Sequence, residues 1–294
     1  MQKFNIILVG RNIEKLNHIK EGILKSKNLS ISSLIMKFLI LLLDNSSIKC
    51  VCVISEAADD SLENINNLFD QIKSLIPSNS AIRILINNVG MGQNGKRRLG
   101  DINVRLDDEK YEGDLFEHVI KVNCIYPVLL TRGYLQRLDK DWGRCAIINI
   151  ASCAALTPST PFSSLYAASK AFNRSFSLSL AGEMEAKRLL HPESTPQVDV
   201  ICVSPGFVVS NMTKMRESLY CCSAEQHAQI VFSKISNSWP LSCIDIIPHW
   251  KHSLMWSILA ALEILIPSEW FLVAIVMPAV LKFSGSFRNF KIKD

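Results

Sequence analysis

Several signatures of common function classes are missing from this chain of 294 residues. Its nine cysteines contain no Cys-x-x-Cys pair, so we expect reduced thiols rather than a zinc site or a disulfide framework. The one metal-like histidine spacing, His249-x-x-His252, has no third ligand nearby in the sequence, and we expect a surface pair without a metal ion. The net charge is only +5, and no basic stripe carries aromatic residues, so nucleic acid is not an expected partner.

Long apolar runs are also missing, because each apolar segment is shorter than the ~20 residues that a membrane-spanning helix needs. We expect neither a signal peptide nor an N-terminal anchor in this chain. Hydrophobic residues nevertheless make up 48% of the sequence, which is enough for a substantial core. The length fits one large domain.

Strands and helices are expected to alternate along the sequence. Short apolar runs predict strands at 5–9, 50–54, 82–86, 146–150 and 198–203. Helical spacing predicts helices at about 12–24, 61–75 and 115–138, the last one broken by Pro127. Near-continuous apolar strands between helices are typical of an α/β fold with a parallel sheet covered on both faces.

The strongest chemical signal lies between the last two of these strands. Tyr166 is the only one of five tyrosines with a lysine four residues on, Lys170, and this spacing places both side chains on one helix face. A neighbouring ammonium group lowers a tyrosine pKa, so Tyr166 can exchange a proton with a substrate oxygen. Ser152, at the end of the preceding strand, can hold that oxygen. These groups indicate carbonyl/alcohol redox chemistry.

With four further segments, this pattern resembles the short-chain dehydrogenase/reductase family. The segments stand in family order at Ile86–Gly90, Val119–Asn123, Ile148–Ser152 and Ser204–Ser210. The resemblance implies a doubly wound parallel sheet of the Rossmann type.

The resemblance also implies a role for each matching residue. Ser152 would position the substrate carbonyl, and Tyr166 would donate the proton. Lys170 would lower the tyrosine pKa and bind the nicotinamide ribose, while Asn123 would hold a water of the proton relay. The remaining cofactor contacts of the family map to Asn88, Gly90, Pro205, Gly206, Val208 and Ser210. Cys153 stands at the family's usual spacing before Tyr166 but is the poorer candidate, because an extra residue in the 157–164 loop explains the shift of Ser152.

One part of the family pattern is missing. A first strand normally leads into a Thr-Gly-x-x-x-Gly-x-Gly turn whose backbone amides bind the cofactor pyrophosphate, and this motif occurs nowhere in the chain. The sequence begins at the family's second strand, and we interpret it as N-terminally truncated. Because the missing strand is central, we expect a gap between strands 5–9 and 82–86, unless the sheet closes up around it.

An apolar stretch at 30–44 is a second departure from the family pattern, and we interpret 30–47 as an insertion. The stretch either forms an extra helix or fills the empty strand position, in both cases without a phosphate-binding glycine turn.

Cofactor preference follows from Arg11, after the strand at 5–9. An acidic residue there would bind the ribose hydroxyls of NAD, whereas an arginine accommodates the 2′-phosphate of NADP. No acidic residue precedes Glu14, so we expect NADP(H) and count Arg11 among the cofactor-binding residues.

Residues 249–294 form an apolar extension after the reductase domain expected at 1–248. Two apolar segments divided by Pro267 lead into a basic end, a pattern that suits an anionic membrane surface through 253–293. The order resembles the branch of 17β-hydroxysteroid dehydrogenases and very-long-chain 3-oxoacyl-CoA reductases, which are membrane-associated proteins of the endoplasmic reticulum. A substrate lid, an in-plane helix pair and ordinary core remain alternatives for 253–282.

The leading hypothesis is an NADPH-dependent carbonyl reductase acting on a steroid or a long-chain 3-oxoacyl-CoA. By analogy with the family, a homodimer would form through the helices of Asn123 and Tyr166. The alternative is an inactive family member that binds lipid or serves as a scaffold. The missing glycine turn favours the alternative, whereas the complete Asn/Ser/Tyr/Lys set opposes it.

Overall fold

The fold is that of a computed structural model of the chain. The residues that the structure describes are 4–10, 14, 16–18, 20–21, 39–44, 50–54, 61–76, 81–92, 115–139, 143–156, 160, 163–193, 196–210, 212–213, 215–237, 245–266, 270 and 278.

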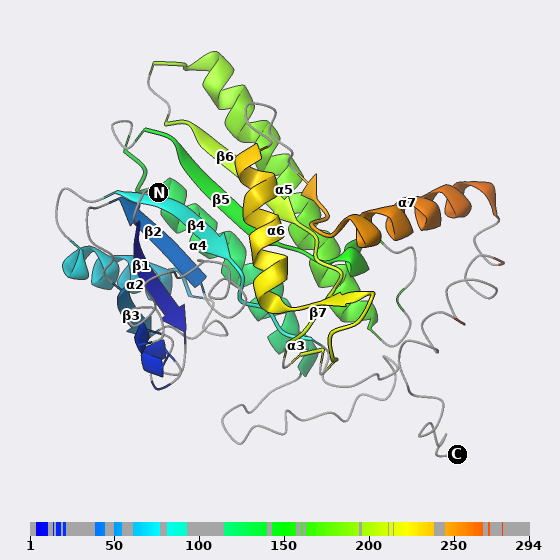
Figure 1. Cartoon of the computed structure of the whole chain (residues 1–294). Helices are drawn as coiled ribbons and strands as arrows, with labels where there is room; N and C mark the ends of the chain where they lie inside the picture. Colours follow the sequence, from blue (N-terminus) through cyan, green and yellow to red (C-terminus); the bar gives the residue numbers. More distant parts are fainter. Residues whose placement is uncertain are drawn as a thin grey trace.

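A seven-stranded sheet runs through the molecule (Figure 1). Its order is β3-β1-β2-β4-β5-β6-β9, and all neighbouring pairs are parallel except the two that involve β2. The strands are β1 (Phe4–Gly10), β2 (Leu39–Asp44), β3 (Cys50–Ile54), β4 (Ile82–Asn87), β5 (Cys145–Ile150), β6 (Val198–Val203) and β9 (Asp245–Ile246). The α/β class and the five strands predicted from the sequence are confirmed.

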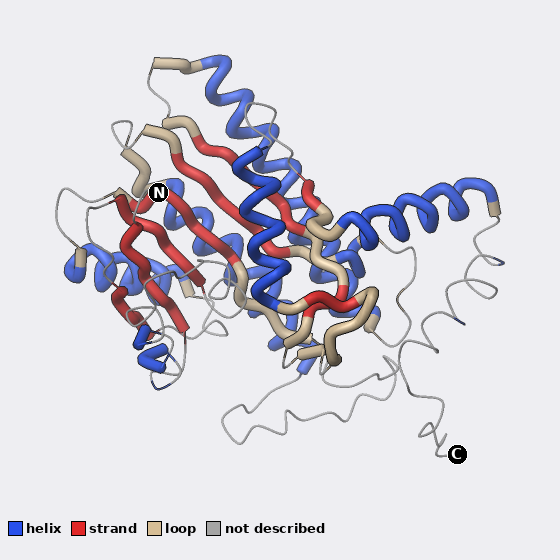
Figure 2. Tube along the Cα trace, viewed as in Figure 1, coloured by secondary structure: helices blue, strands red, loops and turns tan. Residues whose placement is uncertain are grey.

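The position between β1 and β4 is filled by β2, which runs antiparallel to both neighbours. Ile7 of β1 pairs with Leu41 of β2, and Leu41 pairs in turn with Leu85 of β4. The prediction of a gap between β1 and β4 is therefore wrong, and so is the prediction of an extra helix at residues 39–44. The alternative prediction, that this segment fills the empty strand position, is confirmed. The physical reason is that unpaired backbone groups along β1 and β4 would each cost ~1–3 kcal/mol if buried. Figure 2 shows this strand within the continuous sheet.

Helices cover both faces of the sheet. On one face, α2 (Leu62–Leu75), α4 (Tyr126–Leu135) and α5 (Ser164–Leu190) enclose a buried hydrophobic cluster, which includes Ile65, Leu85, Tyr134 and Ile147. On the other face, α6 (Ala224–Asn237) lies over β4 and β5 (Figure 1). Ser61 caps α2, because its hydroxyl accepts a hydrogen bond from the amide of Asn64.

The helix expected at 115–138 has an irregular turn in its middle. It consists of α3 (Leu115–Ile120), a π-helical turn over Lys121–Ile125 and then α4. The chain stays helical through Pro127, which lies in the first turn of α4 directly after the π-helical turn. The wide turn instead contains Asn123, and such turns occur frequently at functional sites.

A small second sheet and one more helix complete the described chain. The strands β7 (Phe207–Val208) and β8 (Cys221–Cys222) form a parallel pair. The helix α7 (Trp250–Leu265) begins shortly after β9 and extends away from the sheet (Figure 1). Several of its large apolar side chains are exposed: Trp250, Leu254, Ile258, Ile264 and Leu265. Among the described residues, no helix is long and apolar enough to cross a membrane.

Candidate active site

The expected catalytic side chains come from three elements that meet at the carboxyl edge of the sheet. Ser152 follows the end of β5, Asn123 lies in the π-helical turn, and Tyr166 and Lys170 lie in the first two turns of α5. Carboxyl ends of parallel strands share one edge, which is where open α/β sheets bind their ligands.

The side chain of Ser152 lies close enough to Tyr166 to lower the pKa of its phenol. Ser152 is half-buried in extended backbone and caps a short 3-10 turn, since its Oγ accepts a hydrogen bond from the amide of Ala154 at 3.1 Å. Cys153 is directed elsewhere, because its side chain is buried and its Sγ donates to the carbonyl of Ser204 at 3.3 Å. Of these two side chains, Ser152 lies next to Tyr166 and Cys153 contacts Ser204.

Asn123 is fully buried and connects the loop after β4 to α5. Its Nδ2 donates to the carbonyl of Met91 at 2.9 Å and to Oγ of Ser169 at 2.9 Å, while its Oδ1 accepts from the amide of Met91 at 2.8 Å. Ser169 then donates to the carbonyl of Tyr166 at 2.8 Å. Asn123 is therefore held rigidly next to the helical turn of the tyrosine, and its contacts here are protein groups.

Lys170 is buried, with only 4% of its surface exposed. Its Nζ donates to the carbonyl of Ile150 at 2.9 Å and lies 5.9 Å from the ring centre of Tyr166. Burial lowers the pKa of Lys170 to about 8, an effect opposed by the neighbouring thiols of Cys124 and Cys202. Near neutral pH the group is still an ammonium ion, close to the ring of Tyr166.

The pKa of Tyr166 differs in direction from the sequence expectation. Burial raises the pKa of this phenol, and the neighbouring side chain of Ser152 lowers it by a smaller amount. The predicted lowering of the Tyr166 pKa by Lys170 is not found in this arrangement. Removal of the phenolate from water destabilises it by more than the nearby groups stabilise it. A raised pKa keeps the phenol protonated near neutral pH, which suits a proton donor.

Several expected cofactor contacts surround these groups. Gly90 faces the site closely, since a side-chain carbon there would lie 3.1 Å from Nζ of Lys170 and 3.4 Å from Oδ1 of Asn123. Pro205 is held next to Ser152, because its carbonyl accepts from the amide of Cys153 at 2.8 Å. Val208 is buried in β7, and Ser210 forms a side-chain hydrogen bond with Thr213. Arg11 lies outside the described residues.

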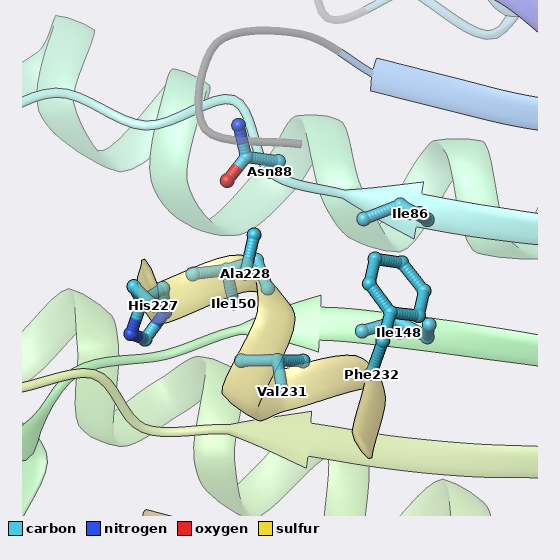
Figure 3. A pocket seen from close by; sticks show the side chains of 8 residues that line it. All are labelled: Ile86, Asn88, Ile148, Ile150, His227, Ala228, Val231 and Phe232. Atoms are coloured by element: carbon cyan, nitrogen blue, oxygen red, sulfur yellow. The ribbon is translucent and has the colours of Figure 1, made fainter. Parts of the chain in front are cut away.

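Asn88 lines a small cavity between the sheet and α6 (Figure 3). The other lining residues are Ile86, Ile148, Ile150, His227, Ala228, Val231 and Phe232. Its volume of about 20 Å³ has room for one water molecule. A dinucleotide would require the surrounding segments to move.

The nicotinamide part and the phosphate part of a dinucleotide fit this chain differently. Buried Lys170, Gly90 and the turn at Pro205 form a set of groups suited to a nicotinamide ribose. The pyrophosphate, by contrast, normally binds where a central parallel strand ends in a glycine turn and a helix begins. Here the strand β2 is reversed, so its first residue, Leu39, lies at that edge. The described chain therefore fits only the nicotinamide end of the cofactor.

Sequence reasoning missed a polar network below the site. Asn87 donates from Nδ2 to Oγ1 of Thr131 at 2.9 Å and to Oδ1 of Asn149 at 2.7 Å, and Asn149 donates to Oγ of Ser177 at 2.9 Å. These side chains are buried and tie β4 and β5 to α4 and α5. The sequence feature that could have indicated this network is the presence of Asn87 and Asn149 in otherwise apolar strands.

The histidines are also placed differently from the prediction. His252 is only 2% exposed, so the expected surface location is wrong for this residue. Its ring centre lies 5.2 Å from that of His249. Burial, together with the charges of His252 and His249, lowers the pKa of His227 to about 4, which shows that a third histidine lies near the pair. Among the described side chains, no group of three or more His, Cys, Asp or Glu could hold a metal ion.

The buried cysteines agree with the expectation of reduced thiols. Cys145 and Cys202 lie in core strands, and buried cysteines outside any disulfide are also found at Cys124, Cys153, Cys221 and Cys222.

Comparison with known proteins identifies the family. The family model described as short chain dehydrogenase matches residues 43–219, more than half of the chain, and the chain belongs to this family. Within it, the chain is similar to proteins named very-long-chain 3-oxoacyl-CoA reductase. The relative from Kluyveromyces lactis is 30% identical over 73% of this chain and 51% of its own length, and that from Aspergillus clavatus is 27% identical over 86% and 61%. The chain thus spans about half to three fifths of these relatives.

Solved structures show the same fold. A short-chain dehydrogenase from Sphingobium yanoikuyae in complex with NADPH has a TM-score of 0.57 at 17% identity, with 87% of this chain and 82% of that chain covered. A short-chain dehydrogenase/reductase from Burkholderia phymatum in complex with NAD has a TM-score of 0.61 at 14% identity, with coverages of 87% and 83%. Both support the Rossmann-like α/β fold.

Proposed function

We propose that this chain is an NADPH-dependent carbonyl reductase acting on a long-chain 3-oxoacyl-CoA. The observation that carries the proposal is the convergence of four side chains, because Ser152 and buried Lys170 both lie next to Tyr166 and Asn123 is hydrogen-bonded to the helix of the tyrosine. This arrangement provides a proton donor, a group to hold the carbonyl oxygen and a neighbouring positive charge.

The residues divide the work of reduction as follows. Ser152 donates a hydrogen bond to the substrate carbonyl oxygen and orients it toward Tyr166. NADPH, when bound, supplies the hydride for the carbonyl carbon. Tyr166 gives its phenolic proton to the oxygen, and Lys170 stabilises the phenolate that is left. Solvent returns the proton, so a ketone, a hydride and a proton become an alcohol.

The substrate class is supported by the two relatives from Kluyveromyces lactis and Aspergillus clavatus, both named for very-long-chain 3-oxoacyl-CoA. A steroid ketone is the less favoured substrate, and membrane association in the endoplasmic reticulum belongs to the same proposal. The exposed apolar side chains of α7 suit a chain that works on lipid next to a membrane. A homodimer through α4 and α5 is part of the proposal by analogy only.

The experiment compares substrates at high cofactor concentration. The purified chain is incubated with millimolar NADPH and either a long-chain 3-oxoacyl-CoA or a steroid ketone, and NADPH consumption is followed by absorbance. We expect consumption with the thioester that rises in proportion to NADPH concentration. Reduction of the steroid alone would assign the other substrate class.

One observation favours a second candidate function. The reversed β2 occupies the position of the parallel strand that normally leads into the phosphate-binding turn. The alternative is therefore an inactive member of the family that binds lipid or acts as a scaffold. A chain that binds long-chain acyl-CoA but consumes no NADPH at any concentration would establish this alternative.

A further inference from the structure

Gly206 and His252 fit together at the end of β6. A side-chain carbon on Gly206 would lie 2.6 Å from Cε1 and Cγ of the His252 ring, and closer still to Nδ1. All three nearest atoms to that position belong to this one ring. The backbone at Gly206 is not in the left-handed region, so the ring, rather than the main chain, is what requires a glycine here.

The far side of the same ring is held by a second backbone segment. Nε2 of His252 lies 2.9 Å from the carbonyl oxygen of Tyr220. A carbonyl oxygen only accepts hydrogen bonds, so Nε2 carries the proton and donates it. The ring is buried, and this bond is therefore protected from competition with water.

These two contacts lie at the N-terminal ends of the two strands of the β7/β8 pair. Gly206 directly precedes β7, and Tyr220 directly precedes β8. The pair itself is short, with ladder partners Phe207–Cys221 and Val208–Cys222, and the amide of Val209 donates to the carbonyl of Cys222 at 2.9 Å. Two-residue strands supply few hydrogen bonds, so a contact that fixes the residue before each strand has a large effect on their pairing.

The neighbouring turn is also held by Cys153, the residue that follows Ser152. The carbonyl of Ser204 accepts from Sγ of Cys153, and the carbonyl of Pro205 accepts from the amide of Cys153. Ser204 also donates to Oδ1 of Asp245 at 3.2 Å. The turn that His252 contacts is thus continuous with the segment that positions Ser152.

We propose that His252 is a positioning residue that clamps the Gly206 turn and the β7/β8 pair beside Ser152 and Tyr166, so that α7 is mechanically part of the active site. The catalytic meaning of this clamp rests on the proposed reductase function, whereas the clamp itself does not. No local pattern indicates the contact, because His252 lies far beyond Gly206 along the chain.

A double-mutant cycle on the whole chain tests the contact without any activity. Amide hydrogen exchange is measured for the parent, Gly206→Ala, His252→Ala and the double variant. Each single variant should accelerate exchange at Val209 at least about tenfold, while exchange in the core of α2 and β5 changes little. In the double variant the ring of His252 is absent, so the alanine at position 206 meets no clash. Exchange at Val209 should therefore differ less than about twofold between His252→Ala and the double variant. Fully additive effects, or no change at Val209, would overturn the clamp.

Two further variants separate positioning from general stability. His252→Gln retains a donor and should restore slow exchange at Val209, whereas His252→Leu should not. His191→Leu removes an exposed histidine at the end of α5 and is the matched control. In the NADPH assay, His252→Leu should lower kcat/KM by about tenfold and His252→Gln should recover it. Fast exchange with unchanged kcat/KM would overturn the positioning role, and an inactive parent would overturn the proposed function while leaving the exchange result valid.

Discussion

Replacement of Lys170 by methionine tests the electrostatics of the site without substrate or cofactor. Burial lowers the pKa of Lys170 to about 8. Its folded-state pKa therefore lies below the unfolded-state value of roughly 10.4. Between these values the unfolded chain binds more protons than the folded one, so stability rises with pH across this window. At ~1.4 kcal/mol per pKa unit, the buried charge costs ~3 kcal/mol at neutral pH, and the cost disappears above the unfolded-state pKa.

The stability of the parent relative to Lys170→Met should consequently increase by ~2 kcal/mol between about pH 7.5 and about pH 10. Methionine fills a similar space, and the lost hydrogen bond to Ile150 affects the variant equally at both pH values. Urea unfolding of both proteins at each pH measures the difference. Lys187→Met, at an exposed position on the same helix, is the control and should show no such pH dependence.

A parent-minus-variant difference that stays constant between the two pH values would contradict this reasoning. It would mean that the ammonium group is solvated in the folded chain. A difference that falls with rising pH would reverse the sign of the shift and would require a stabilising anion near Lys170.

Three further predictions concern the cofactor, the serine and α7. Because β2 is reversed, NADPH should bind this chain weakly, and micromolar affinity in a titration of cofactor fluorescence would refute this expectation. Ser152→Ala should lower turnover at least about tenfold, while Cys153→Ser should change it less than about threefold; the opposite ranking would show that the choice of Ser152 is wrong. Serine substitutions at the exposed positions Leu254, Ile258 and Ile264 should abolish co-sedimentation with anionic vesicles and leave the melting temperature nearly unchanged. Unchanged pelleting, or no pelleting of the parent, would show that this face does not bind lipid.

Much of the fold was predictable because its signals are local. The strands β4, β5 and β6 are largely apolar runs, and the spacing of Tyr166 and Lys170 fixes their common helix face. Of the four expected catalytic residues, Ser152 follows a strand whose end was clear in the sequence, and the other three lie within helical segments. Their convergence then results from the geometry of a parallel sheet, in which carboxyl ends share one edge.

The missed features depend on contacts between distant segments. The run Leu39–Asp44 is apolar up to its last residue, and such a run does not distinguish a buried helix from a strand, let alone its direction. Its place is decided by the open hydrogen-bonding edges of β1 and β4. The burial of His252 and the raised pKa of Tyr166 likewise depend on the packing of segments far apart in sequence, which spacing along the chain does not report.

The most direct measurement is the turnover of Tyr166→Phe with a long-chain 3-oxoacyl-CoA and millimolar NADPH. Phenylalanine retains the ring and removes only the hydroxyl that carries the proton. We predict that kcat falls by about a hundredfold or more, while cofactor affinity stays close to that of the parent. A variant that kept more than about a tenth of the parent kcat would show that Tyr166 is not the proton donor.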